Sequence, residues 1–187
     1  MNKTLRLLII SDIFIFSGFG LIAPILAIFI KDNLVGGTIF AAGIASTIYL
    51  LVHSVLQIIF SYKFTPKDRI WMLWVGTALI ALVPFGYIFS TSIYHLYAVQ
   101  FIYGLGAAFA YPTWSSLFTS NLEKGKRGFQ WSIYSSSVGI GTAITAGVGA
   151  WLAEKTNFQV VFIFTGILSI IGLIYLFRLD KRILRKT

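Results

Sequence analysis

The stretch SDIFIFSGFGLIAPILAIFI, residues 11–30, is nearly all apolar and is long enough to cross a bilayer, which takes about 20 residues in a helix. Asp12 places a carboxyl group near its start, and Pro24 lies inside it. A charged side chain in a membrane helix costs about 3 kcal/mol on insertion scales and is functional by default. Proline removes a backbone hydrogen-bond donor. We therefore expect a membrane helix whose carboxyl group faces a polar environment and which bends near Pro24.

The rest of the chain continues this pattern. Of the 187 residues 57% are hydrophobic and 11% are charged, whereas soluble domains carry about 25% charged residues. The backbone in lipid must satisfy its own hydrogen bonds, so apolar spans form helices. The first span is too long for a signal peptide, and no cleavage site follows it. The sequence predicts an all-α membrane protein, a single domain over residues 1–187 with six spans at about 5–30, 38–62, 70–90, 96–120, 129–153 and 158–179.

The basic residues alternate from one connection to the next. Of the 15 Lys and Arg residues, 13 fall at the two ends of the chain or in the second and fourth connections, and only Lys31 and Lys155 fall in the others. The positive-inside rule then places both termini in the cytoplasm, in a multi-pass protein of the cell (inner or plasma) membrane. The net charge of +9 is thus interpreted as a topology signal and a contact with lipid headgroups, and no nucleic-acid partner is expected.

Metal and enzymatic chemistry are not indicated. The sequence has no cysteine, and His53 and His95 are far apart without companions at ligand spacing, so neither a metal nor another cofactor is expected. All connections are short, and no nucleophile–base constellation is found within the spans.

A weak internal repeat is visible. GFGLIAP (residues 18–24) and GLGAAFAYP (residues 104–112) both carry G-x-G followed by a proline. The six spans are therefore expected to form two three-helix repeats, a common construction of secondary transporters. Pro24, Pro84 and Pro112 are each expected to bend their helices.

With these motifs the sequence resembles the N-terminal six-helix half of the major facilitator superfamily. Asp12, Gly18, Gly20 and Pro24 follow the family's first helix, LYAVQFIYGLGAAFAYP (residues 96–112) its fourth, and KRG and NFQVVF its later loops. The resemblance implies a secondary transporter that works by alternating access. The sequence departs from the family at Gln100, where an arginine associated with proton coupling is usual. The gating loop reads SYKFTPKDR and keeps Arg69, with Asp68 as a candidate replacement for the missing aspartate.

Asp12 and His53 are expected at similar depth, both facing a water-filled cavity, with Asp12 binding a proton or a cationic group. The alternative is that Asp12 snorkels to the membrane surface or bonds neighbouring backbone, and that His53 is hydrogen-bonded within the packing of the second span. Two polar–aromatic faces at helical spacing suit an amphipathic organic substrate, although interhelical hydrogen bonding uses the same residue types. The faces comprise Ser46, Tyr49, His53 and Gln57 on the second span, and Gln100, Tyr103, Ala107 and Tyr111 on the fourth.

The fifth span carries two rows of small residues, which permit close helix approach and predict contact on two sides. We name them the outer row (Ser135, Gly139, Ala143, Gly147) and the inner row (Gly141, Thr145, Gly149). Five tryptophans are interpreted as anchors at the membrane interface, namely Trp71, Trp74, Trp114, Trp131 and Trp151.

These observations favour half of a secondary transporter, either ion- or proton-coupled or facilitative, for a small molecule of unknown identity. It would need a second bundle, supplied by a parallel homodimer, by a separate partner half, or by the remainder of a twelve-helix protein. The alternative is a polytopic scaffold or assembly factor that transports nothing. An intramembrane enzyme is the most distant possibility.

Overall fold

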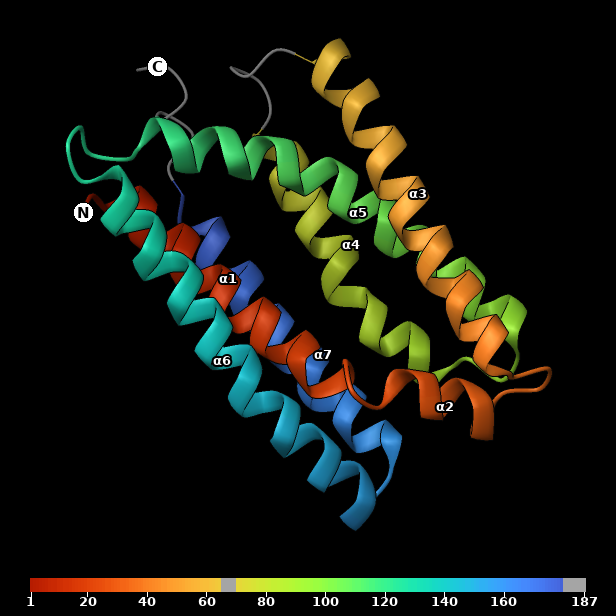
Figure 1. Cartoon of the computed structure of the whole chain (residues 1–187). Coiled ribbons are helices and arrows are strands. Elements are labelled where there is room, and N and C mark those ends of the chain that lie inside the picture. The colour runs from red at the N-terminus through yellow and green to blue at the C-terminus, as the bar shows by residue number, and fades with distance from the viewer. Residues whose placement is uncertain (65–69, 180–187) are drawn as a thin grey trace.

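The computed structural model describes residues 1–64 and 70–179 and is helical throughout this part (Figure 1). Six of its helices are long and apolar enough to cross a membrane, as the sequence predicts. Arg69 and Asp68 lie outside the described residues. The helices are α1 (Lys3–Ile22), α2 (Leu26–Asn33), α3 (Ile39–Lys63), α4 (Ile70–Ile88), α5 (Ile93–Ser120), α6 (Arg127–Lys155) and α7 (Phe158–Phe177).

The first predicted span, 5–30, is not one helix, and this prediction is corrected. α1 ends at Ile22, and α2 begins at Leu26 after a turn closed by a hydrogen bond from the Ile25 N–H to the Ile22 carbonyl at 3.0 Å. Pro24 sits in this turn and has no N–H to continue the helix. Pro84 and Pro112 lie inside α4 and α5, which remain continuous, and α5 curves along its length (Figure 1).

The other spans begin and end within three residues of their predicted bounds. Side-chain caps explain two of the starts. Thr38 Oγ1 accepts a hydrogen bond from the Ala41 N–H at 2.9 Å, and Asn157 Oδ1 accepts one from the Val160 N–H at 3.0 Å. Each satisfies a backbone donor that the first turn of a helix leaves free, and so fixes where α3 and α7 begin.

The helix contacts have the symmetry of a repeat. α1 packs against α6 and α7, and α5 packs against α3 and α4, while α4 also contacts α7. If α1 is exchanged with α5, α3 with α6 and α4 with α7, this set of contacts is unchanged. The two predicted three-helix repeats are therefore present, and each contributes a central helix, α1 or α5, that packs on two helices of the other repeat.

Glycines allow the central helices to approach their neighbours closely. A Cβ at Gly20 would lie 3.1 Å from the Thr142 Cα of α6, and one at Gly104 would lie 2.8 Å from the Tyr49 carbonyl oxygen of α3. Neither gap admits a larger side chain without moving backbone. The G-x-G motifs thus place the α1–α6 and α3–α5 pairs at short range.

Two apolar cores occupy opposite ends of the bundle. Core A gathers residues of α2, the start of α3 and the end of α4, such as Phe29, Ala45 and Tyr87. Core B gathers the start of α1, the start of α4 and the ends of α5 and α7, such as Leu5 and Phe118.

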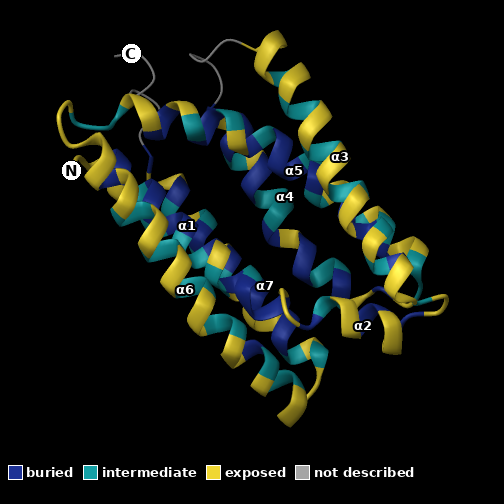
Figure 2. Cartoon of the chain, in the orientation of Figure 1, coloured by how far each residue is buried: buried dark blue, intermediate teal, exposed yellow. Residues whose placement is uncertain are grey.

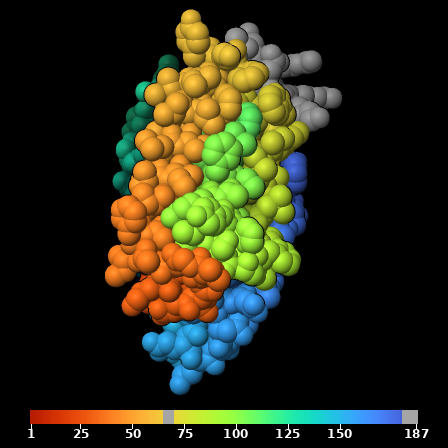
Figure 3. All heavy atoms as spheres, turned by 90° about the vertical axis from the view of Figure 1, so that its right-hand side faces the viewer, coloured from red at the N-terminus to blue at the C-terminus, as the bar shows by residue number. Residues whose placement is uncertain are grey.

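α3 and α6 are the least covered spans. Only 17% of the most apolar window of α3 and 6% of that of α6 are buried, against 39% or more in each of the other four spans. The two helices flank the bundle and are largely exposed along their outer sides (Figure 2). Figure 3 shows the face on which α3 lies beside α5.

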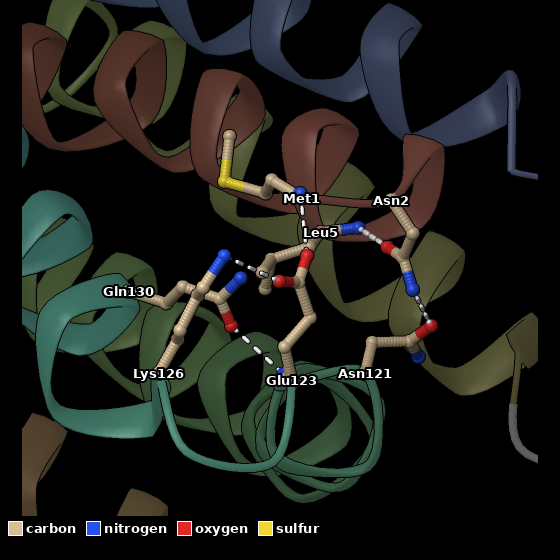
Figure 4. A network of polar contacts seen from close by, with 7 residues as sticks. All are labelled: Met1, Asn2, Leu5, Asn121, Glu123, Lys126 and Gln130. Carbon is tan, nitrogen blue, oxygen red and sulfur yellow. Dashed lines mark hydrogen bonds and ion pairs between the residues drawn. The ribbon is translucent and has the colours of Figure 1, made fainter.

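Both ends of the bundle are fastened by polar contacts between the repeats. At one end, Asn2 caps α1 by accepting a hydrogen bond from the Leu5 N–H at 2.8 Å and donates to Asn121 Oδ1 at 2.6 Å, while the Met1 ammonium pairs with Glu123 (Figure 4). At the other end, the Val35 N–H donates to the Thr91 carbonyl at 3.0 Å. The first set of contacts joins the start of α1 to the connection between α5 and α6, and the second joins the connection between α2 and α3 to the connection between the two repeats.

Glu123 gives the first of these fasteners a defined pH dependence. It lies 3.9 Å from the Lys126 Nζ, and its backbone N–H donates to Gln130 Oε1 at 2.9 Å (Figure 4). The hydrogen bond and charge of the Met1 ammonium lower the pKa of the Glu123 carboxyl below its ordinary value of 4.5. The contribution of the pair is therefore complete above that ordinary value and is lost as the pH falls through the lowered one.

We expect Glu123→Gln to speed hydrogen–deuterium exchange of residues 120–130 at pH 7, because the charge that holds this connection is removed. The difference between the variant and the wild type should shrink as the pH falls below 4.5 and Glu123 is protonated. Glu154→Gln, at the other end of α6, is the matched control and should change neither. A difference that persists undiminished at pH 3 would contradict an electrostatic role for Glu123.

Candidate functional site

A cavity of about 170 Å³ lies between core A and core B. It is lined by five of the spans, and both repeats contribute. Asp12 of α1, His53 of α3 and Thr77 of α4 come from the first repeat, and Tyr103 of α5 and Tyr134 of α6 from the second. The other lining residues are Ile15, Phe16, Phe19, Tyr49, Leu73, Ile80, Ala107, Ala110, Tyr111 and Trp114.

The Asp12 carboxylate has a specific partner on the opposite repeat. The Tyr134 hydroxyl donates to Asp12 Oδ2 at 2.9 Å, and Asp12 is only 8% exposed. This contact is possible because the inner row of α6 lies against α1. The predicted alternative, in which Asp12 bonds neighbouring backbone, is not what the described residues show.

Aromatic rings continue around the cavity from this point. Measured between ring centroids, Trp114 lies 5.0 Å from Tyr134 and 6.4 Å from Tyr111. Tyr111 in turn lies 5.8 Å from His53, and these two rings meet edge to face. The chain of rings then passes to α3. The cavity is therefore walled by side chains whose faces and edges already contact one another.

The series closes on α1. Tyr49 lies 5.9 Å from His53 and stacks on Tyr103 at 4.2 Å, and Tyr103 stacks on Phe19 at 4.9 Å. Phe19 lies two turns from Asp12 on α1, and Asp12 is the partner of Tyr134, at which the series of rings began. We name this set the aromatic wall, and it comprises Phe19, Tyr49, His53, Tyr103, Tyr111, Trp114 and Tyr134.

Two polar atoms of the aromatic wall have no partner among the described residues. They are His53 Nε2 and Trp114 Nε1, each buried. The indole N–H is a donor only, while the imidazole nitrogen takes either role according to its tautomer. A buried polar group without a partner costs about 1–3 kcal/mol. Neither atom is accessible to water in this structure, so a molecule in the cavity would reach them only after the two side chains move.

The structure brings together most of the residues that the sequence singled out. Asp12, Tyr49, His53, Tyr103 and Tyr111 all line the cavity, whereas Gln57 and Gln100 do not. Gln100 is 4% exposed, and its Oε1 has no partner within the described part of the chain. The two polar–aromatic faces therefore converge through their aromatic members.

Trp114 and Tyr134 were not predicted as site residues. Trp114 was interpreted as an interface anchor, but it is 6% exposed and packs inside the bundle. It lies three residues after Tyr111, and so on the predicted face of α5, which is the signal that could have found it. Tyr134 belongs to a helix whose sequence is otherwise dominated by small residues, and no signal in the sequence singled it out. Trp71 and Trp151 are 43% and 59% exposed, as expected of anchors.

The two small-residue rows of α6 have different surroundings. In the inner row, a Cβ at Gly149 would meet the Leu21 backbone, and one at Gly141 would meet the Ser17 side chain. In the outer row, a Cβ at Gly139 or Gly147 would meet nothing within 4 Å. One row thus packs on α1, as predicted, and the other has no partner among the described residues.

The chemistry available to this cavity is binding. The lining contains one carboxylate and no Lys or Arg side chain. Among the described residues no group of three His, Cys, Asp or Glu side chains could hold a metal ion. An apolar, aromatic cavity with a few convergent polar atoms is the usual form of a small-molecule site.

Comparisons with known proteins place this arrangement in a family. The family model described as the Major Facilitator Superfamily matches residues 8–187. An uncharacterized MFS-type transporter of Methanocaldococcus jannaschii is 28% identical over 162 residues, which are 84% of this chain and 40% of that protein. The voltage-gated purine nucleotide uniporter SLC17A9 of Rattus norvegicus is 30% identical over 93 residues, 47% of this chain and 21% of that protein.

The fold is also that of a solved transporter. The crystal structure of the POT family transporter PepTSo aligns with a TM-score of 0.70 at 16% identity, covering 95% of this chain and 37% of that one. The chain thus spans about two fifths of the length of the archaeal relative. The six spans, their repeat and the family match agree, and the chain belongs to the Major Facilitator Superfamily.

Proposed function

We propose that this chain is one half of a secondary transporter that carries a small molecule across the cell membrane by alternating access. The observation that carries the proposal is the cavity, which lies at mid-depth between two apolar cores and is lined by both repeats. Facilitator-type carriers hold their substrates near the bilayer midplane, at the interface of structural repeats. In this proposal the cavity is this half's share of the substrate site.

The second bundle would lie against α3 and α6. These two spans are the least buried, and the outer row of α6 is open, so they offer close-packing surfaces with nothing on them. Both termini are proposed to be cytoplasmic, which allows either a second copy inserted in parallel or a separate half to pair about an axis along the membrane normal. The proposal therefore includes two possible second bundles, a second copy of this chain and a separate half.

The lining of the cavity does not suit the substrate named for the rat relative. The rat relative is named a uniporter of purine nucleotides, which are anions, and the described cavity offers a carboxyl group and no Lys or Arg side chain. Asp12 is the candidate for a coupling or substrate-binding group, whereas Gln100 carries no charge. The proposal is therefore of a carrier, either ion- or proton-coupled or facilitative.

Cysteine accessibility tests the proposal directly, because the natural sequence has no cysteine. Ala107→Cys in the cavity should react with a membrane-impermeant thiol reagent from both sides of the membrane, with the preferred side changing as the carrier changes state. Ala45→Cys in core A, where the side chain is 1% exposed, is the control and should stay unreactive. If Ala107→Cys is sealed under all conditions, the carrier proposal fails and a scaffold is favoured.

A further inference from the structure

We propose that the cavity binds a small organic cation, of the alkylammonium or aromatic-amine class. This inference rests on the proposed function, since it names the substrate class of the same site. Its first support is charge: Asp12 is the one acidic residue of the lining, and no Lys or Arg side chain opposes it. A buried carboxylate is stabilised by an opposite charge brought close to it, which a cationic ligand supplies.

The aromatic wall is the second support. Eight of the 15 lining residues carry an aromatic ring, and their contacts run without interruption from Phe19 to Tyr134. Ring faces attract cations through their quadrupole, most strongly when water is excluded. An aromatic enclosure with a carboxylate at one point therefore selects positive charge over neutral or negative ligands of the same shape.

The position of Asp12 leaves room for such a ligand. Its Oδ2 accepts one hydrogen bond, from Tyr134, whereas a carboxylate has about four acceptor sites. Tyr134 thus orients the group without using up its acceptor capacity. An ammonium group beside Asp12 would lie next to the rings of Tyr134 and Trp114, which are themselves in contact at 5.0 Å.

Size and polarity narrow the ligand further. A cavity of about 150 Å³ accommodates benzene, so the 170 Å³ here suits one ring with a compact charged group. Apart from Asp12, the polar groups of the lining are hydroxyl, indole and imidazole groups, and they suit a ligand with one charged group and an otherwise apolar body. Phenyltrimethylammonium is a fitting probe, and tert-butylbenzene is its neutral isostere.

The experiment measures binding of both compounds, and of benzoate, to the purified chain in nanodiscs by titration calorimetry or by displacement of radiolabelled phenyltrimethylammonium. Phenyltrimethylammonium should bind at least about tenfold more tightly than tert-butylbenzene, and benzoate should not compete. Equal affinity for the cation and its isostere, preference for benzoate, or absence of cation binding would each overturn the proposal.

Variants assign the selectivity to named residues. Asp12→Asn keeps an acceptor for Tyr134 and should weaken cation binding at least about tenfold while leaving tert-butylbenzene unaffected. Asp32→Asn, at an exposed position of α2, is the matched control. Unchanged cation affinity in Asp12→Asn contradicts the proposal.

The substrate class and the carrier function fail separately. If cation selectivity is absent but Ala107→Cys still reacts from both sides, the chain remains a carrier of another substrate class. If the cation binds selectively but Ala107→Cys never changes its accessible side, the site is real and transport is not its use.

Discussion

Gly149→Ala is expected to lower the thermal stability of the chain markedly, whereas Gly147→Ala, two residues earlier on the same helix, is not. A Cβ at Gly149 would lie 2.6 Å from the Leu21 Cα and 2.7 Å from its carbonyl carbon, while a Cβ at Gly147 meets nothing within 4 Å. Backbone cannot rotate away as a side chain can, so α1 and α6 must separate. Such overpacking costs about 1–3 kcal/mol or more.

The measurement is the melting temperature in a mild detergent, followed by size-exclusion chromatography of heated samples. A loss of 1 kcal/mol corresponds to about 2–4 °C in a chain of this size. Helix propensity alone favours alanine over glycine by about 1 kcal/mol, so Gly147→Ala should be neutral or slightly stabilising. Equal melting of the two variants would show that α1 and α6 are not packed as described.

The double variant Gly139→Leu/Gly147→Leu should keep its fold and its stability but lose its pairing with a second bundle. Both glycines belong to the outer row, and a Cβ at either position meets no atom of the described residues within 4 Å, so we expect a leucine to be accommodated there. Substitutions at such surface positions change stability by about 0.5 kcal/mol or less. A partner bundle packed on this row, however, would be pushed away.

Cross-linking in native membranes measures the second effect, with the fraction of paired chains expected to fall at least about tenfold. Val75→Leu, which enlarges an exposed side chain on α4, is the control and should pair normally. Normal pairing of the double variant would mean that the second bundle does not use the outer row.

Much of the fold could be predicted from the sequence because lipid imposes strong rules. A span must be long, apolar and helical, so five of the six are bounded by composition and capping residues alone. The two G-x-G motifs indicated the repeat, since close helix approach requires small residues at fixed spacing. The break between α1 and α2 was only partly foreseen: Pro24 indicated a bend, and whether a proline bends or ends a helix depends on the packing around it, as Pro84 and Pro112 illustrate.

The site residues that recur at helical spacing on one face of a span could be predicted from the sequence. Tyr49 and His53, and Tyr103 and Tyr111, share helix faces, and those faces meet. Trp114 was misinterpreted because tryptophan near a span end is common both at interfaces and in a packed interior, and the curvature of α5 decides between them. Tyr134 could not be found, since its role depends on how α6 is turned against α1, which the sequence does not encode locally. Gln100 is polar and lies on a predicted face, yet its place is outside the cavity.

The fasteners at the two ends of the bundle have a mechanical consequence. Asn2 is joined to Asn121 at one pole and Val35 to Thr91 at the other, so hinge bending inside these six spans would have to break contacts at both poles at once. In the proposed carrier, the six spans should therefore move as a rigid body. The change between states should occur at the surface of α3 and α6 that faces the second bundle, and not by bending within the six spans.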